Sequence, residues 1–174
     1  MFDELFGLPA HPLMVHAPVV LIPITVLIAV VYGLIPPARQ RLGWLLILFA
    51  LAGAGTAYAA VESGNRFAVR KGGISPIIAE HQDFGEMVRN LAGLLALVAV
   101  VLVIVDRARH RRRRLQFADD GSPHTYARAR SGGVLLGAVS IVLTLGLLGV
   151  AGGAGYYVVR SGHSGATMVW DTTP

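Results

Sequence analysis

Four long apolar stretches, separated by short polar connections, dominate the hydrophobic pattern of the chain. They lie at about residues 13–35, 43–61, 84–105 and 133–159. A helix needs about 20 mostly apolar residues to cross the roughly 30 Å hydrocarbon core of a membrane, and each stretch is about that long. The pattern predicts an all-α fold, an integral membrane four-helix bundle that forms a single domain over residues 1–174.

The connections indicate how the stretches follow one another. Pro36 and Pro37 end the first stretch and force a tight turn, so the first two stretches are expected to form an antiparallel hairpin. The chain starts with Asp3 and Glu4 and not with basic residues. The first stretch is therefore expected to be a retained span and not a cleaved signal peptide.

The basic residues predict the orientation of the spans. Ten of the 15 basic residues fall in two connections, at Arg39 and Arg41 and in the loop 106–130. Since positively charged loops stay in the cytoplasm, we expect a multi-pass protein of the cell membrane with the loop 106–130 in the cytoplasm. Both termini, with a short tail at 160–174, are then on the extracytoplasmic side.

Composition supports the lipid bilayer as the main partner. The chain is 54% hydrophobic and 14% charged, whereas soluble domains are about 25% charged. The net charge of +5 does not indicate nucleic acid, because the arginines gather in one loop where they act as a topology signal. The absence of cysteine excludes disulfides, thiolate sites, iron–sulfur clusters and thioether-linked haem.

Small residues and prolines suggest how the helices pack. Gly53 with Ala57, and Gly149 with Gly153, have the small-xxx-small spacing that allows helices to approach closely in lipid. These glycine-rich faces fit tight packing within the bundle, contact with a membrane partner or a second copy, or room for a flat cofactor. Two prolines inside the first stretch predict a helix kink, namely Pro18 and Pro23.

Four of the six histidines fall at the same end of the four predicted spans. His11 and His16 open the first stretch, His81 precedes the third and His163 follows the fourth, whereas His110 and His124 lie across the bilayer. Imidazole is the commonest metal ligand and titrates near neutral pH. We expect His16 and His81 to be the inward-facing pair, with His11 and His163 as further ligands or helix caps.

Other polar residues near this end are candidates to support the site. They are Tyr58, Glu62, Asp83, Glu86, Arg89 and Asn90. Tyr58 and Glu62 are one helical turn apart, and Glu86 can pair with Arg89 at a spacing of three residues. The segment Gly162–Gly165, which contains His163, predicts a turn that folds the tail back.

The pattern leaves several functions open. A copper or zinc ion would take three or four of these histidines, with Glu62 or Asp83 as oxygen ligands. One b-type haem would need only two, and His16 with His81 is the expected pair. A proton-linked role is a further alternative, and so is simple helix capping. The sequence contains no nucleophile–base arrangement, so an enzyme is less expected than a module of a redox or ion-handling assembly. The alternatives are an accessory membrane subunit without a cofactor, or a small transporter component.

Residues 11–18 also carry a family resemblance. They read His-Pro-Leu-Met-Val-His-Ala-Pro, which resembles the opening signature His-Pro-x-x-Val-His-Phe-Pro of the bacterial predicted membrane proteins called domain of unknown function 2231. His81 and the tail from Gly162 to Trp170 resemble the same family. Ala17 stands where the family usually has an aromatic residue. The resemblance implies four spans and supports the choice of His11, His16 and His81, but it brings no established activity.

Overall fold

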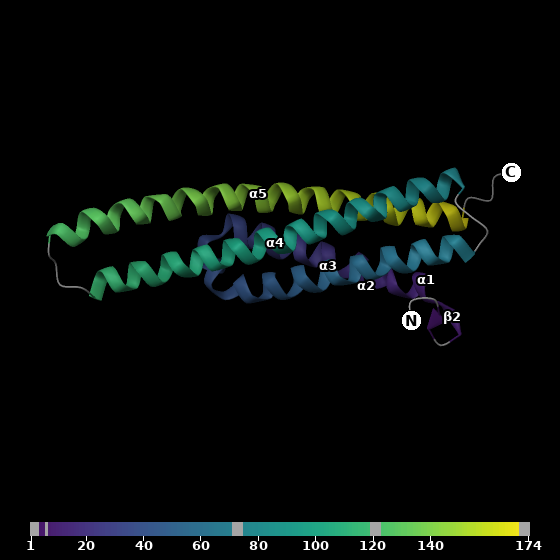
Figure 1. The fold of residues 1–174 in the computed structure, drawn as a ribbon, viewed down its shortest axis with the longest axis horizontal. Coiled ribbons are helices and arrows are strands. Elements are labelled where there is room, and N and C mark those ends of the chain that lie inside the picture. Colours follow the sequence, from purple (N-terminus) through teal and green to yellow (C-terminus); the bar gives the residue numbers. More distant parts are fainter. Residues whose placement is uncertain (1–3, 6, 71–74, 119–122, 171–174) are drawn as a thin grey trace.

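The computed structural model describes residues 4–5, 7–70, 75–118 and 123–170. Figure 1 shows a long helical bundle with a small antiparallel hairpin near its start. The elements are β1 (Glu4–Leu5), β2 (Leu8–Pro9), α1 (Ala10–Met14), α2 (His16–Leu34), the 3-10 turn η1 (Pro36–Ala38), α3 (Arg39–Arg70), α4 (Pro76–Ala118) and α5 (Pro123–Trp170).

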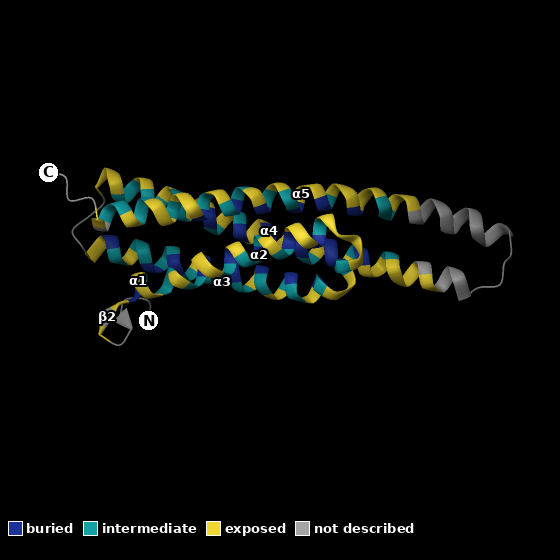
Figure 2. Cartoon of the chain, turned by 180° about the vertical axis from the view of Figure 1, so that it is seen from behind, coloured by how far each residue is buried: buried dark blue, intermediate teal, exposed yellow. Residues whose placement is uncertain are grey.

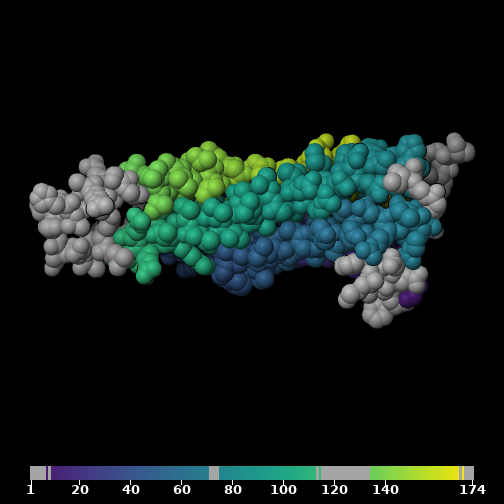
Figure 3. Space-filling model, viewed as in Figure 1, coloured from purple at the N-terminus to yellow at the C-terminus, as the bar shows by residue number. Residues whose placement is uncertain are grey.

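Within the described residues, four helical segments are long and apolar enough to cross a membrane, as the sequence predicts. They are 10–34, 36–70, 76–112 and 134–168. α2 contacts α3 and α5, and α4 contacts α3 and α5, so the four helices form a closed ring. Figure 3 shows α3 and α4 side by side along this ring.

The helices are longer than the apolar stretches that predict them. α4 has 43 residues and is therefore about 65 Å long, roughly twice the hydrocarbon thickness. Most of the loop predicted at 106–130 is helical, because α4 continues to Ala118 and α5 begins at Pro123. The local sequence is rich in arginine and alanine. Both residues favour helix formation even where the helix has no apolar face to bury.

The turn predicted at Gly162–Gly165 is also absent, because α5 continues without a break to Trp170. The Ser164 and Thr167 hydroxyls bond to carbonyls of the preceding turn, at 3.0 Å and 2.9 Å. These bonds keep both polar side chains within the helix and do not divert the backbone. Helix–helix packing outweighs the cost of about 1 kcal/mol that each glycine imposes on an isolated helix.

The start of the first span is irregular. Val15 separates α1 from α2, so Pro18 lies in the first turn of α2, where its missing N–H would have no partner within that helix. Pro23 is the proline inside α2. Val15 itself keeps helical backbone angles, and its N–H donates to the His11 carbonyl at 3.1 Å, so α2 follows directly on α1.

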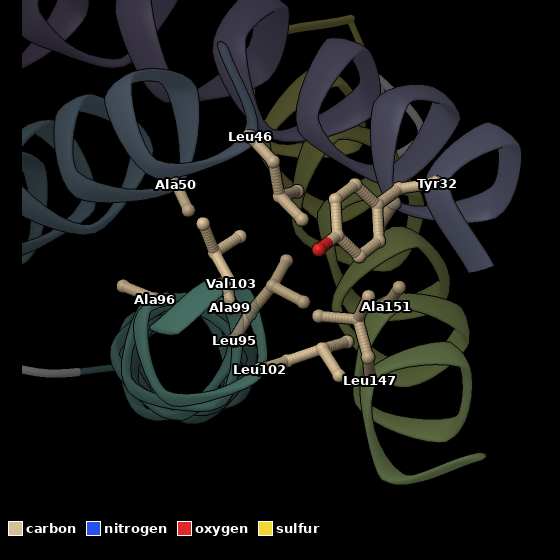
Figure 4. Packing of buried hydrophobic residues seen from close by; sticks show 11 residues of the cluster. Tyr32, Leu46, Ala50, Leu95, Ala96, Ala99, Leu102, Val103, Leu147 and Ala151 are labelled. Atoms are coloured by element: carbon tan, nitrogen blue, oxygen red, sulfur yellow. The ribbon is translucent and has the colours of Figure 1, made fainter. Parts of the chain in front are cut away.

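The hydrophobic cluster around Tyr32 consists otherwise of aliphatic side chains and alanines. In Figure 4 the ring of Tyr32 reaches from α2 into the interior, near Leu46 of α3 and Leu147 of α5. Figure 2 shows buried and exposed positions alternating along each helix. The exposed positions include many large apolar residues, for example Leu27, Leu97 and Leu145. A bundle with this surface is suited to lipid and not to water.

Candidate functional site

The structure brings two of the four predicted histidines together. The rings of His11 on α1 and His81 on α4 are side by side, with centroids 6.3 Å apart and planes inclined by 78°. Both side chains are half-buried. Phe67 of α3 also stacks on His11, with a centroid distance of 6.4 Å. The pair thus lies inside the end of the bundle where α1, α3, α4 and α5 meet.

His16 differs from the expectation that it is the inward-facing partner of His81. It is the first residue of α2 and its side chain is exposed. His11 lies five residues before His16, or about 140° around a helix, so the face of α1 that packs against α3 carries His11 and not His16. His163 is exposed as well, one residue before the Ser164 that contacts His81.

The hydrogen bonds of His11 define its tautomer. Its Nδ1 is 3.0 Å from the carbonyl oxygen of Ala60 and 3.2 Å from the Ser63 hydroxyl. A carbonyl can only accept, so Nδ1 carries the proton and donates it. The Ser63 hydroxyl donates its own hydrogen to Ala60, at 2.8 Å, and therefore also accepts from Nδ1. In the neutral ring, Nε2 then keeps a free lone pair.

The same reasoning applies to His81. Its Nδ1 is 2.9 Å from the hydroxyl of Ser164. That hydroxyl donates its single hydrogen to the carbonyl of Ser161, at 3.0 Å, so it accepts from His81 and Nδ1 again carries the proton. No hydrogen bond among the described residues engages Nε2 of either ring. Two neighbouring imidazoles thus each present an Nε2 lone pair.

Two glycines make room for these rings. A Cβ atom on Gly64 would lie 2.9 Å from Cε1 of His11, and one on Gly165 would lie 3.1 Å from Cε1 of His81. Each imidazole therefore packs directly on the backbone of a facing helix. Sequence reasoning missed Ser63 and Gly64. Their signal was an adjacent Ser-Gly pair among the polar residues that follow the second apolar stretch.

The comparisons with known proteins address the chain as a whole. A family described as Predicted membrane protein (DUF2231) matches residues 7–173. The chain belongs to the DUF2231 family. No curated protein and no solved structure matches it. The match includes all four spans and both histidines of the pair.

The predicted supporting residues of this DUF2231 chain make their hydrogen bonds and ion pairs, as far as the described residues show, with other side chains and not with the pair. Glu62 binds Arg66 at 2.9 Å, and Glu86 is 3.9 Å from Arg89. Arg89 also donates to Asn90, at 3.2 Å. Tyr58 and Asp83 are exposed, with no hydrogen bond to either histidine among the described residues.

The described part of the DUF2231 chain contains no group of three or more His, Asp or Glu side chains arranged to hold a metal ion. The three- or four-ligand site considered from the sequence is therefore not assembled within these residues. His110 is exposed and belongs to the opposite end of α4. The side chain of His124 lies outside those that the structure describes.

A second polar cluster lies at the opposite end of the bundle, and the sequence reasoning missed it. Asp106 is buried, with 5% of the residue exposed, and its carboxylate accepts hydrogen bonds from Tyr32 at 2.9 Å and from Ser140 at 2.6 Å. Arg39 is 3.4 Å from the same carboxylate and donates to Thr144 at 3.2 Å. We refer to Tyr32, Arg39, Asp106, Ser140 and Thr144 as the Asp106 network.

The Asp106 network ties every span to its neighbours. Arg39 also donates to the backbone carbonyls of Tyr32 and Gly33, both at 3.0 Å, which fixes the turn between α2 and α3. The sequence signal was present: Ser140 and Thr144 are polar residues one turn apart inside an apolar stretch, and Asp106 directly follows another. Polar residues at such places usually face inward and find partners.

Proposed function

We propose that this protein is a membrane redox module in which His11 and His81 are the axial ligands of one b-type haem. The observation that carries the proposal is the pair of Nδ1-protonated imidazoles with free Nε2 atoms on two different helices. Haem iron needs only two ligands from the protein, whereas zinc and copper sites generally take three or four.

The geometry of the pair supports this choice of ligand. A metal–imidazole bond is about 2 Å long, so two rings on opposite sides of one ion have centroids about 6 Å apart. The centroids of His11 and His81 are 6.3 Å apart. Metal-bound histidines almost always donate their other ring N–H to a carbonyl or a similar acceptor. Ala60, Ser63 and Ser164 supply such acceptors.

Haem bound in this way would supply one-electron transfer, since two axial histidines leave no open position on the iron. The residues of the chain would hold the ligand nitrogens and fix their tautomers through Ser63 and Ser164. Phe67 would cover one side of His11. This role needs no substrate pocket and no catalytic base, and it fits a module within a larger redox assembly.

A visible spectrum tests the proposal. Protein purified in mild detergent is expected to show a Soret band that shifts on reduction with dithionite. His11→Ala and His81→Ala should each abolish the band, while the matched variants His16→Ala and His163→Ala should keep it. A colourless protein, or loss of the band in His16→Ala with retention in His11→Ala, would overturn the assignment. Elemental analysis of a colourless sample would identify copper or zinc in place of haem.

A second candidate function is a structural accessory subunit without a cofactor. It is favoured by the outward-facing glycines of α5, because Gly146, Gly149 and Gly152 have open space around a built Cβ atom. Such a surface allows a helix of a partner or of a second copy to approach closely. Absence of any cofactor, combined with a co-purifying membrane protein that Gly149→Leu releases, would support this role.

We also infer the orientation from charge. The arginines 107–114 follow the third span, and Arg39 and Arg41 follow the first. Positive-inside topology then puts the Asp106 network near the cytoplasm and the histidine pair near the extracytoplasmic face, with both termini on that side.

A further inference from the structure

A cavity of about 320 Å³ opens beside the Asp106 network. Its walls come from the end of α2, the start of α3 and one face of α4. On α4 the lining residues include Asp106, Arg107, His110, Arg111 and Arg114. The two adjacent pairs and Arg114 recur every three or four residues, about one helical turn, which puts them on a single side of the helix. The cavity is thus part of the folded bundle and not a gap in a loop.

The lining of this cavity is strongly positive. It includes Arg39, Arg107, Arg111 and Arg114 against one carboxylate, that of Asp106. Asp106 already accepts from Tyr32 and Ser140 inside the bundle. Among the described residues, no acidic side chain pairs with Arg107, Arg111 or Arg114. Three guanidinium groups are therefore available to a ligand from outside the chain.

The position of the cavity indicates the kind of ligand. The apolar stretch of α4 ends at Val105, so the arginines begin where the hydrocarbon ends and the lipid headgroups start. Guanidinium groups bind phosphate through paired, charge-assisted hydrogen bonds. Basic pockets between spanning helices on this side of a membrane commonly hold anionic headgroups.

We propose that this cavity binds a phosphate group. Arg107, Arg111 and Arg114 would donate hydrogen bonds to it, and Arg39 would supply a positive charge held in place in the cavity wall. The anionic headgroup of a phospholipid and free inorganic phosphate are the two sources of that group. Arg39 is held by Asp106 and Thr144, so its charge is in place before the ligand arrives.

Native mass spectrometry of the full-length protein tests this proposal with three probes. They are phosphatidylglycerol and phosphatidylcholine in matched micelles, and inorganic phosphate without lipid. The pocket variant is Arg111→Gln with Arg114→Gln. The control is Arg41→Gln with Arg112→Gln, which removes the same charge at the same end from two exposed residues outside the cavity lining.

We expect wild type and control to retain one phosphatidylglycerol in preference to phosphatidylcholine. The pocket variant should bind it about ten-fold more weakly, or weaker still, because charge-assisted hydrogen bonds are lost. The same arginine dependence with inorganic phosphate alone would support the site and identify free phosphate as its source. Equal loss in both double variants, or no loss in either, would overturn the proposal, since general surface charge would then explain any binding.

Discussion

The serine beside each histidine controls the chemistry of the ring. Ser164 accepts the Nδ1–H of His81 at 2.9 Å, and Ser63 does the same for His11 at 3.2 Å. These bonds select the tautomer in which Nε2 keeps its lone pair. His11 has a second acceptor in the Ala60 carbonyl. His81 likewise has a backbone acceptor beside its serine, the Ser161 carbonyl.

Ser164→Ala removes the hydroxyl that accepts the Nδ1–H of His81. We expect haem affinity to fall about 10- to 100-fold, the usual effect of losing a partner of a metal-bound histidine. Haem titration in detergent measures the change, and Ser164→Thr should restore much of it. The control is Thr167→Ala, whose hydroxyl bonds only within α5. Equal losses in Ser164→Ala and Thr167→Ala would contradict the role of Ser164.

Gly64→Ala tests the close contact of His11 with the backbone of α3. The new Cβ would lie 2.9 Å from Cε1 of the ring, so the imidazole must move. We expect a destabilisation of about 1–3 kcal/mol from overpacking and a weaker Soret band. Gly55→Ala is the control on the same helix, since a Cβ there meets nothing within 4 Å. It should leave the melting temperature unchanged or higher, and a similar loss in both variants would refute the packing argument.

At the scale of the elements, the Asp106 network joins the span ends. Asp106→Leu would leave Arg39 without its carboxylate, and both side chains are largely buried, at 7% and 17% exposed. Removing one partner of a buried ion pair lowers the free energy of unfolding by about 3 kcal/mol. The variant should therefore melt at a clearly lower temperature in detergent.

The exposed pair of Glu62 and Arg66 provides the comparison for that experiment. Glu62→Gln alters an i,i+4 pair on the surface of α3, where such pairs contribute about 0.5 kcal/mol or less. Its thermal melt should stay close to that of the wild type. Similar melting of the two variants would mean that the network does not hold the spans together.

The sequence predicted the spans well because lipid imposes a simple condition of length and apolarity. It predicted the helix ends poorly, since the polar flanks of α4 and α5 remain helical through propensity and packing. The choice of His11 over His16 could not be read from periodicity. It depends on the packing of α1 against α3 and on the contact of His11 with Ala60, both of which are tertiary effects.

At the scale of the whole molecule, the orientation is open to a direct test. The chain has no cysteine, so single substitutions can be labelled without background. We expect a membrane-impermeant maleimide to label Gly162→Cys in intact cells, and Arg112→Cys only after the membrane is opened. Both residues are exposed. Labelling of Arg112→Cys in intact cells would reverse the inferred topology.

The distance between the two polar ends of α4 has a consequence for any partner. His81 and Asp106 are separated by about 37 Å along the helix, and the interior between them consists of residues such as Leu95, Ala99 and Leu102. This interior is an electrical insulator. For the haem proposed at the histidine pair, an electron would therefore arrive and leave at the same end of the bundle, so its donor and its acceptor would share one face.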